Sequence, residues 1–188
     1  MNYLVLVKHS LPEIIPTTPA KEWQLSKAGR VRCKALADHL APYFPDVLIS
    51  SLEPKAIETA QIAAHRLNKP YYTHEGLHEH DRTGVDFLGR ERFEAKVKES
   101  FFHPDRLVFG KETAAQAVER FSKALTAVEV EHPNKNIVVV SHGTVITLFV
   151  EKISNLDSYS FWRSLDLPAF VVLSLPQHSL VKIVESVV

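Results

Sequence analysis

Two short apolar runs, each followed two residues later by a histidine, constrain the fold of this chain most strongly. Residues 3–10 read YLVLVKHS, and residues 137–143 read IVVVSHG. Apolar runs this short, without a polar break, are typical of strands buried on both faces of a parallel sheet. Ligands of open α/β folds bind at the carboxyl edge of such a sheet. Because each run delivers its histidine to that edge, we expect His9 and His142 to lie at one site.

Strand and helix patterns alternate along most of the chain, which indicates an α/β fold with a largely parallel sheet. Strands are predicted at residues 3–10, 47–49, 71–73, 137–143, 170–175 and 180–184, the last two joined by a hairpin-like turn. Helices are predicted after Ser26, from Pro54, around residues 93–101 and 114–128, after Gly143, and for one or two turns within 157–163.

The length and composition favour a single domain. The chain has 188 residues, of which 45% are hydrophobic, and this suffices for one sizeable core. No repeat or convincing linker interrupts it. We therefore interpret residues 1–188 as one domain, with residues 84–110 as an insertion that covers the site.

The charge balance excludes several classes of partner. Lys plus Arg and Asp plus Glu are equal at 22 each, so the net charge favours neither nucleic acid nor a membrane surface. The single cysteine, Cys33, excludes an intrachain disulfide and suits a reducing compartment. No apolar run approaches the ~20 residues that span a bilayer, and no signal-peptide pattern opens the chain. A cytoplasmic protein is predicted, and its oligomeric state is left open.

Basic residues gather at the ends of the predicted strands. Small neighbours, Ser10 and Gly143, would let backbone N–H groups face a ligand, and nearby helix starts add positive dipole ends. On a neutral protein this combination favours a site for a small dianion, and phosphate fits best. The four basic residues are Lys8, His9, Lys55 and His142.

The same groups suggest a chemistry. A neutral histidine can attack phosphorus and carry the phosphoryl group covalently, which divides one hard displacement into two easier steps. The leaving oxygen then needs a proton from an acid. The polar loop of residues 74–86, HEGLHEHDRTGVD, offers Glu79, with Glu75 and Asp81 as rivals.

Six motifs in this order resemble the histidine phosphatase superfamily, also called the phosphoglycerate mutase-like family. The Arg-His-Gly strand end of that family reads Lys8-His9-Ser10 here, and its Leu-Thr-x-x-Gly helix start reads LSKAG at residues 25–29. Its Ser-Ser segment with a downstream arginine reads SSLEPKAIETA at residues 50–60. The Leu-x-Glu element reads LHE at residues 77–79, a Gly-Glu-Ser-like start reads GKET at residues 110–113, and the final Ser-His-Gly matches at residues 141–143.

The resemblance covers nearly the whole chain and has specific implications. It implies a three-layer α/β/α sandwich of the phosphoglycerate mutase-like type, a phosphohistidine intermediate on His9, and no metal or organic cofactor. It implies Glu79 as the general acid. His142, Lys8, Lys55, Ser10 and Gly143 would hold the phosphoryl group of a small phosphorylated substrate. A phosphoric monoester hydrolase is therefore predicted.

This sequence departs from the family pattern at the phosphate-binding cations. Lysines, Lys8 and Lys55, stand at both positions where the family has arginine, so the charge is kept while the planar fork is lost. Ser10 replaces a glycine, and Glu13 adds a negative charge to the following loop. These changes keep open a phosphate-binding protein with little turnover, and a mutase is a further alternative.

A metal site is one more alternative for the polar loop. Its histidines and carboxylates could in principle complete a zinc or manganese site, although they match no fixed ligand spacing. The residues in question are His74, His78, Glu79, His80 and Asp81.

Overall fold

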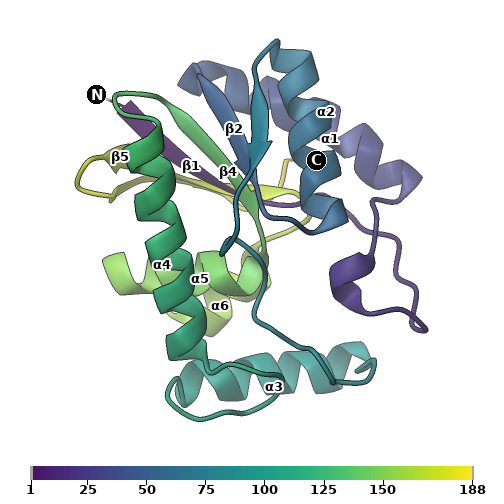
Figure 1. Ribbon diagram of the computed structural model, residues 1–188. Coiled ribbons are helices and arrows are strands. Elements are labelled where there is room, and N and C mark those ends of the chain that lie inside the picture. The colour runs from purple at the N-terminus through teal and green to yellow at the C-terminus, as the bar shows by residue number, and fades with distance from the viewer. Residues whose placement is uncertain (1, 188) are drawn as a thin grey trace.

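A six-stranded mixed sheet, in the order β3-β2-β4-β1-β5-β6, forms the centre of the computed structural model, which describes residues 2–187 (Figure 1). The strands are β1 (Asn2–Lys8), β2 (Val47–Ser50), β3 (Tyr71–Thr73), β4 (Ile137–Ser141), β5 (Ala169–Leu175) and β6 (Ser179–Val184). The helices are α1 (Lys27–Leu40), α2 (Pro54–Leu67), α3 (Arg90–Phe102), α4 (Ala114–Glu131), α5 (Gly143–Ile153) and α6 (Ser158–Ser164), with short 3₁₀ turns η1 (Ala20–Glu22) and η2 (Ala41–Tyr43).

The two histidine-bearing strands are neighbours at the centre of the sheet. β1 and β4 pair in parallel, and Lys8 lies opposite Ser141 in their register. The next residues, His9 and His142, therefore leave the sheet side by side, and the His9 N–H donates to the Ser141 carbonyl at 3.0 Å. The predicted meeting of these two strand ends is confirmed.

The rest of the sheet agrees with the predicted fold class. β3, β2, β4 and β1 are mutually parallel, whereas β5 runs antiparallel to β1 and β6 antiparallel to β5. The predicted terminal hairpin is the β5–β6 pair. The sheet is thus largely parallel, and the predicted α/β/α sandwich is confirmed.

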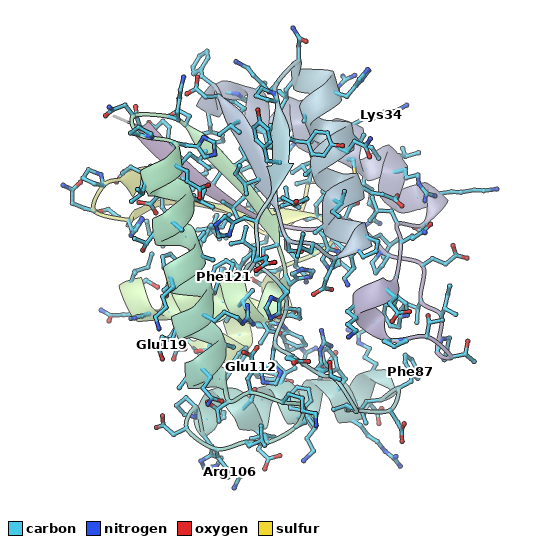
Figure 2. The ribbon with its side chains drawn as sticks, viewed as in Figure 1. Lys34, Phe87, Arg106, Glu112, Glu119 and Phe121 are labelled. Carbon is cyan, nitrogen blue, oxygen red and sulfur yellow. The ribbon has the colours of Figure 1, made fainter. Side chains whose placement is uncertain are left out.

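Helices cover the two faces of the sheet and enclose two cores (Figure 1). α1 and α2 pack on one face, where alanines such as Ala60 allow close approach, and α4, α5 and α6 pack on the other. Phe121 lies on the inner side of α4, while Glu119 points away from the sheet (Figure 2). Cys33 is buried on α1, as its place in the apolar pattern predicted. Within residues 2–187 no helix is both long and apolar enough to cross a membrane.

The segment 84–110 folds mainly into α3, which lies across the end of the helical layer (Figure 1). Phe93 of α3 meets Trp162 of α6 edge to face, with ring centroids 5.8 Å apart. The segment is therefore tied to the helix that precedes β5. Its interpretation as an insertion over the site stays a prediction.

Gly29 allows α1 to approach the loop that follows β1. Ser26 caps α1 by accepting the Gly29 N–H at 3.0 Å, and its own N–H donates to the Leu11 carbonyl at 3.0 Å. A Cβ atom on Gly29 would lie 2.1 Å from that same carbonyl oxygen. Since real Cβ atoms do not approach backbone oxygens so closely, only glycine fits here.

We expect Gly29→Ala to lower the free energy of unfolding by about 3 kcal/mol, because the clash is with backbone and cannot be relieved by a rotamer change. Urea denaturation of wild type and variant measures this. Gly89→Ala is the matched control, since a Cβ there meets nothing within 4 Å. Equal destabilisation of the two variants would contradict this account of Gly29.

Candidate active site

His9 and His142 form the centre of the candidate site. Their ring centroids lie 5.1 Å apart with an interplanar angle of 64°. His9 is 7% exposed and His142 is fully buried. The strand register alone accounts for this proximity, because both rings follow paired residues of β1 and β4.

The surroundings of His9 leave one ring nitrogen available as a nucleophile. Its Nδ1 lies 2.7 Å from the Ser10 carbonyl oxygen. Because a carbonyl can only accept, Nδ1 carries the proton and Nε2 keeps its lone pair. Burial lowers the pKa of His9 well below its ordinary value, and the nearby His142 and Lys55 lower it further. The ring is therefore neutral, as attack on phosphorus requires.

The N–H and hydroxyl groups of Ser10 donate to acceptors of the protein rather than facing a ligand. Its N–H donates to Thr59 Oγ1 at 3.0 Å, and its hydroxyl donates to the Gly29 carbonyl at 2.8 Å. The expectation that the Ser10 N–H faces a phosphate is wrong for this structure, because the Thr59 hydroxyl occupies that donor. Ser10 instead orients His9 through its carbonyl.

His142 is held by a hydroxyl and a carboxylate from the β2–α2 connection. Its Nε2 lies 2.7 Å from Ser51 Oγ and 3.4 Å from Glu53 Oε1, while its Nδ1 has no hydrogen-bond partner among residues 2–187. Burial lowers the pKa of His142 well below its ordinary value, and the charge of Lys55 adds to this shift. His142 is thus a second neutral imidazole beside the first.

Lys55 lies in the first turn of α2, as predicted, but its charge is shared with a buried carboxylate. Its Nζ forms an ion pair with Glu53 Oε2 and donates to the Ala20 carbonyl at 2.8 Å. The other Glu53 oxygen accepts the Glu79 N–H at 3.0 Å. Burial lowers the pKa of Lys55, and Glu53 opposes that shift. Glu53 is not among the residues predicted for the site; its one signal in the sequence is a carboxylate two residues before Lys55 in the motif that follows β2.

Lys8 reaches over the start of α5. Its Nζ donates to the Leu165 carbonyl at 2.5 Å. A Cβ on Gly143 would lie 3.2 Å from Lys8 Cε and 3.4 Å from Trp162 Nε1, so the glycine makes room for both side chains. Burial lowers the pKa of Lys8 to about 8, although Glu79 and Asp166 act in the opposite direction.

Glu79 lies against the N-terminus of α5. Its Oε2 accepts the Thr144 N–H at 3.2 Å, and its Oε1 accepts the His80 N–H at 2.9 Å. Burial alone would raise the pKa of Glu79, but Arg82, His142 and the two N–H donors outweigh it and place the pKa below its ordinary value. Glu79 is therefore a carboxylate in the free protein.

The rival carboxylates do not occupy equivalent positions. Asp81 accepts the Thr83 N–H at 2.8 Å and so stabilises its own turn, and Glu75 is exposed. Glu79 is the one of the three that interacts with His142.

The alternative of a metal cluster in the polar loop is wrong for this structure. Within the described residues, no group of three or more His, Cys, Asp or Glu side chains is placed to hold a metal ion. The reason is that these side chains diverge: His74 bonds to the Glu75 carbonyl, and His80 lies 2.8 Å from the Glu112 carbonyl.

A mixed α/β/α sandwich brings two neutral histidines, two lysines and the carboxylates of Glu53 and Glu79 to one edge of the sheet. The family model of the histidine phosphatase superfamily (branch 1) matches residues 11–181, so the chain belongs to this superfamily. The predicted family is confirmed.

Individual relatives agree with this assignment. The chain is 23% identical over 133 residues to the uncharacterized phosphatase PhoE of Bacillus subtilis (strain 168). The matched region covers 71% of this chain and 66% of that relative's length. A phosphoserine phosphatase mutant from Entamoeba histolytica, in complex with phosphoserine, has 19% identity and a TM-score of 0.78 over 100% of this chain and 98% of that one. Mycobacterial glucosyl-3-phosphoglycerate phosphatase has 16% identity and a TM-score of 0.73 over 97% and 96%. The two structures match the fold.

Proposed function

We propose that the chain hydrolyses a small phosphomonoester through a phosphohistidine on His9. One observation carries this proposal: a buried, neutral His9 whose Nδ1 is committed to the Ser10 carbonyl and whose Nε2 is free, beside the site's cations. Membership of the superfamily and the phosphatase relatives support the predicted class of phosphoric monoester hydrolase.

The proposed reaction has two displacements. His9 Nε2 attacks phosphorus, the P–N bond forms, and the ester P–O bond breaks while protonated Glu79 gives its proton to the leaving oxygen. Water then attacks the phosphohistidine. Glu79, now a carboxylate, takes a proton from that water as the P–N bond breaks and phosphate is released.

Glu79 must gain a proton before the first displacement, since the free protein holds it as a carboxylate. A bound phosphoryl group brings negative charge close to Glu79, and a like charge raises the pKa of a carboxyl group. Substrate binding therefore favours the protonated acid that the first step needs.

The phosphoryl group is held by groups at the ends of β1, β2 and β4. Lys8, Lys55 and His142 surround His9, and the start of α5 at Gly143 contributes its dipole. Ser10 is a positioning residue for His9 in this scheme, in place of the contact expected from the sequence.

A panel of phosphorylated compounds, tested for phosphate release, can narrow the substrate class. The related Entamoeba phosphatase has been seen with phosphoserine and with 3-phosphoglyceric acid, so small phosphorylated acids are the natural first choices. We expect wild type to release phosphate from an aryl phosphate and from members of this panel, with inhibition by vanadate, a mimic of five-coordinate phosphorus.

The buried Lys55–Glu53 pair favours a second candidate, a phosphate-binding protein with little turnover, since Glu53 neutralises one of the cations. Phosphate binding in a calorimeter without release from any panel substrate would replace the hydrolase with this candidate.

The pKa of Lys8 leads to a pH prediction. We expect phosphate affinity and kcat/KM to fall as pH rises through about 8, because the Lys8 ammonium loses its proton there. Inhibition constants for phosphate from pH 6.5 to 9.5 measure this. The Lys8→Arg variant is the control. Arginine stays charged over this pH range, so phosphate affinity and kcat/KM should not fall near pH 8 in the variant, whatever its absolute rate.

Unfolding does not account for that fall. The pKa of Lys8 is lowered from 10.5 to about 8, so between these values the unfolded chain binds more protons at this group. The contribution of Lys8 to stability therefore rises with pH in this window. An unchanged affinity up to pH 9.5, or the same fall in Lys8→Arg, would contradict the role of Lys8.

Glu53 provides another prediction. Glu53→Gln keeps an acceptor for the Glu79 N–H but removes the charge that neutralises Lys55. We expect phosphate affinity to rise roughly tenfold, about 1.4 kcal/mol. The free energy of unfolding should fall by about 3–5 kcal/mol, because a buried charge loses its partner. Glu58→Gln is the control, because Glu58 lies farther along α2 and pairs with Arg30 of α1. Weaker phosphate binding in Glu53→Gln would show that Glu53 assists the site.

A further inference from the structure

Arg82 is a largely buried cation whose donors are uncommitted. Its side chain is only 26% exposed, yet no acceptor among residues 2–187 forms a hydrogen bond with its guanidinium. Its nearest charged partner is Glu79, with Nη2 3.8 Å from Oε2, beyond hydrogen-bonding distance. None of its nitrogen atoms is among the buried side-chain atoms that lack a partner, so the guanidinium N–H donors are open to water and to a ligand.

Arg120 is similarly buried, but its donors all bind acceptors of the protein, as expected of an arginine with a structural role. It donates to the carbonyls of Gly76, His78 and Glu79 and to both carboxylate oxygens of Glu112. All its donor groups are used to tie the polar loop to α4. Arg82 lies in the same loop, but no protein acceptor takes its donors, which leaves them available to a ligand.

The backbone around Arg82 is firmly held. The Asp81 N–H donates to Glu112 Oε1 at 2.9 Å, and the Asp81 carbonyl accepts the Lys111 N–H at 2.8 Å. Glu112 lies just before α4 (Figure 2). Gly110, at φ +81°, leaves room for this contact, since a Cβ there would lie 2.0 Å from the Asp81 oxygen. The unused donors of Arg82 therefore do not reflect a loose loop.

The Arg82 side chain is also oriented. Its guanidinium carbon lies 4.7 Å from the centre of the Phe93 ring, and Phe93 in turn contacts Trp162. A planar cation stacked on one face presents its N–H groups at the edges. Phe93 thus covers one face of the guanidinium and leaves its edge groups for a ligand.

Arg82 faces the groups that are proposed to surround phosphorus. Burial lowers the pKa of Lys55 and of His142, and the positive charge of Arg82 adds to both shifts. Glu79, 3.8 Å away, must come within about 3 Å of the ester oxygen to protonate it, and that oxygen is bonded to phosphorus. The guanidinium is therefore within reach of the phosphoryl group.

The two lysines cannot bind two phosphoryl oxygens at once in the way that the Arg82 guanidinium can. Lys8 Nζ already donates to the Leu165 carbonyl, and Lys55 Nζ to Glu53 and to the Ala20 carbonyl. Both are point charges, whereas a guanidinium binds two oxygens at once. Among the described cations at this site, Arg82 is the one whose donors all lack a protein acceptor.

We propose that Arg82 binds the phosphoryl oxygens of the substrate through a bidentate contact. This inference rests on the proposed function and adds to it a residue outside the six motifs. On binding, the guanidinium turns from Glu79 to the phosphoryl oxygens. That movement removes the cation that favours the carboxylate form of Glu79 at the moment when the acid must be protonated.

The test compares wild type with Arg82→Ala, Arg82→Lys and Arg90→Ala, the last a surface control on α3. Two readouts are used: inorganic phosphate affinity by calorimetry, and kcat/KM on an aryl phosphate and on a phosphomonoester with a carboxylate beside the ester. We expect Arg82→Ala to lose about 100-fold in phosphate affinity and in kcat/KM on both substrates. Arg82→Lys should recover only part of this loss, and Arg90→Ala should match wild type.

Each outcome decides a separate question. Unchanged phosphate affinity in Arg82→Ala overturns the proposal, as does a loss confined to the carboxylate-bearing substrate, which would assign Arg82 to the leaving group. Full recovery by Arg82→Lys overturns the bidentate contact. A wild type that binds phosphate without turnover refutes hydrolysis, while the calorimetry still tests Arg82. Thermal melting confirms that each variant is folded.

Discussion

His9→Ala should lower phosphate release by about 10³-fold or more, the largest catalytic effect that we expect in this chain. The variant loses the atom that forms the covalent intermediate, so the remaining groups could only assist direct attack by water. Brief reaction of wild type with a phosphorus-labelled substrate should leave an acid-labile label on His9, and none should appear in the variant.

The control is His178→Ala. His178 pairs with Glu129 at 2.7 Å, away from the site, and so reports the general cost of losing a histidine. Its activity should match wild type. A label on any other residue, or full activity in His9→Ala, would refute covalent catalysis at His9.

The fold was predictable because local patterns and global topology agree. β1 and β4 are apolar along nearly their whole length, which is the signature of central parallel strands, and this alone placed His9 beside His142. Ser26 at the N-cap of α1 and Pro54 at the first position of α2 marked the starts of these helices correctly. Such features depend on neighbouring residues in the chain, so a single sequence reveals them.

The polar interior of the site was less predictable. Glu53 and Ser10 are oriented by partners from distant segments: Glu53 accepts the Glu79 N–H, and the Ser10 N–H donates to Thr59. Whether a charged residue in a loop turns to solvent or inward depends on these long-range contacts. The places of Lys8 at the end of β1 and of Lys55 in the first turn of α2 were predictable, but their carbonyl partners were not.

Glu79→Gln should separate acid catalysis from phosphate binding. Glutamine keeps one oxygen that can accept the N–H group of His80 or of Thr144, but it cannot give a proton to the leaving oxygen. We expect a loss of about 10²- to 10⁴-fold in kcat on an alkyl phosphate, whose alkoxide leaves poorly without a proton. On an aryl phosphate with an acidic phenol the rate of the first displacement should fall far less, because that leaving group departs as an anion.

Asp81→Asn is the matched control, since it also changes one carboxylate of the loop and should affect both substrates little. A burst experiment gives a further check, because the phenol leaves in the first displacement and phosphate leaves in the second. Glu79 also activates the water that cleaves the phosphohistidine, so Glu79→Gln should accumulate labelled His9 with the aryl substrate. Equal losses on alkyl and aryl phosphates, without phosphoenzyme accumulation, would remove Glu79 from the proton transfers and leave it a residue that orders the start of α5.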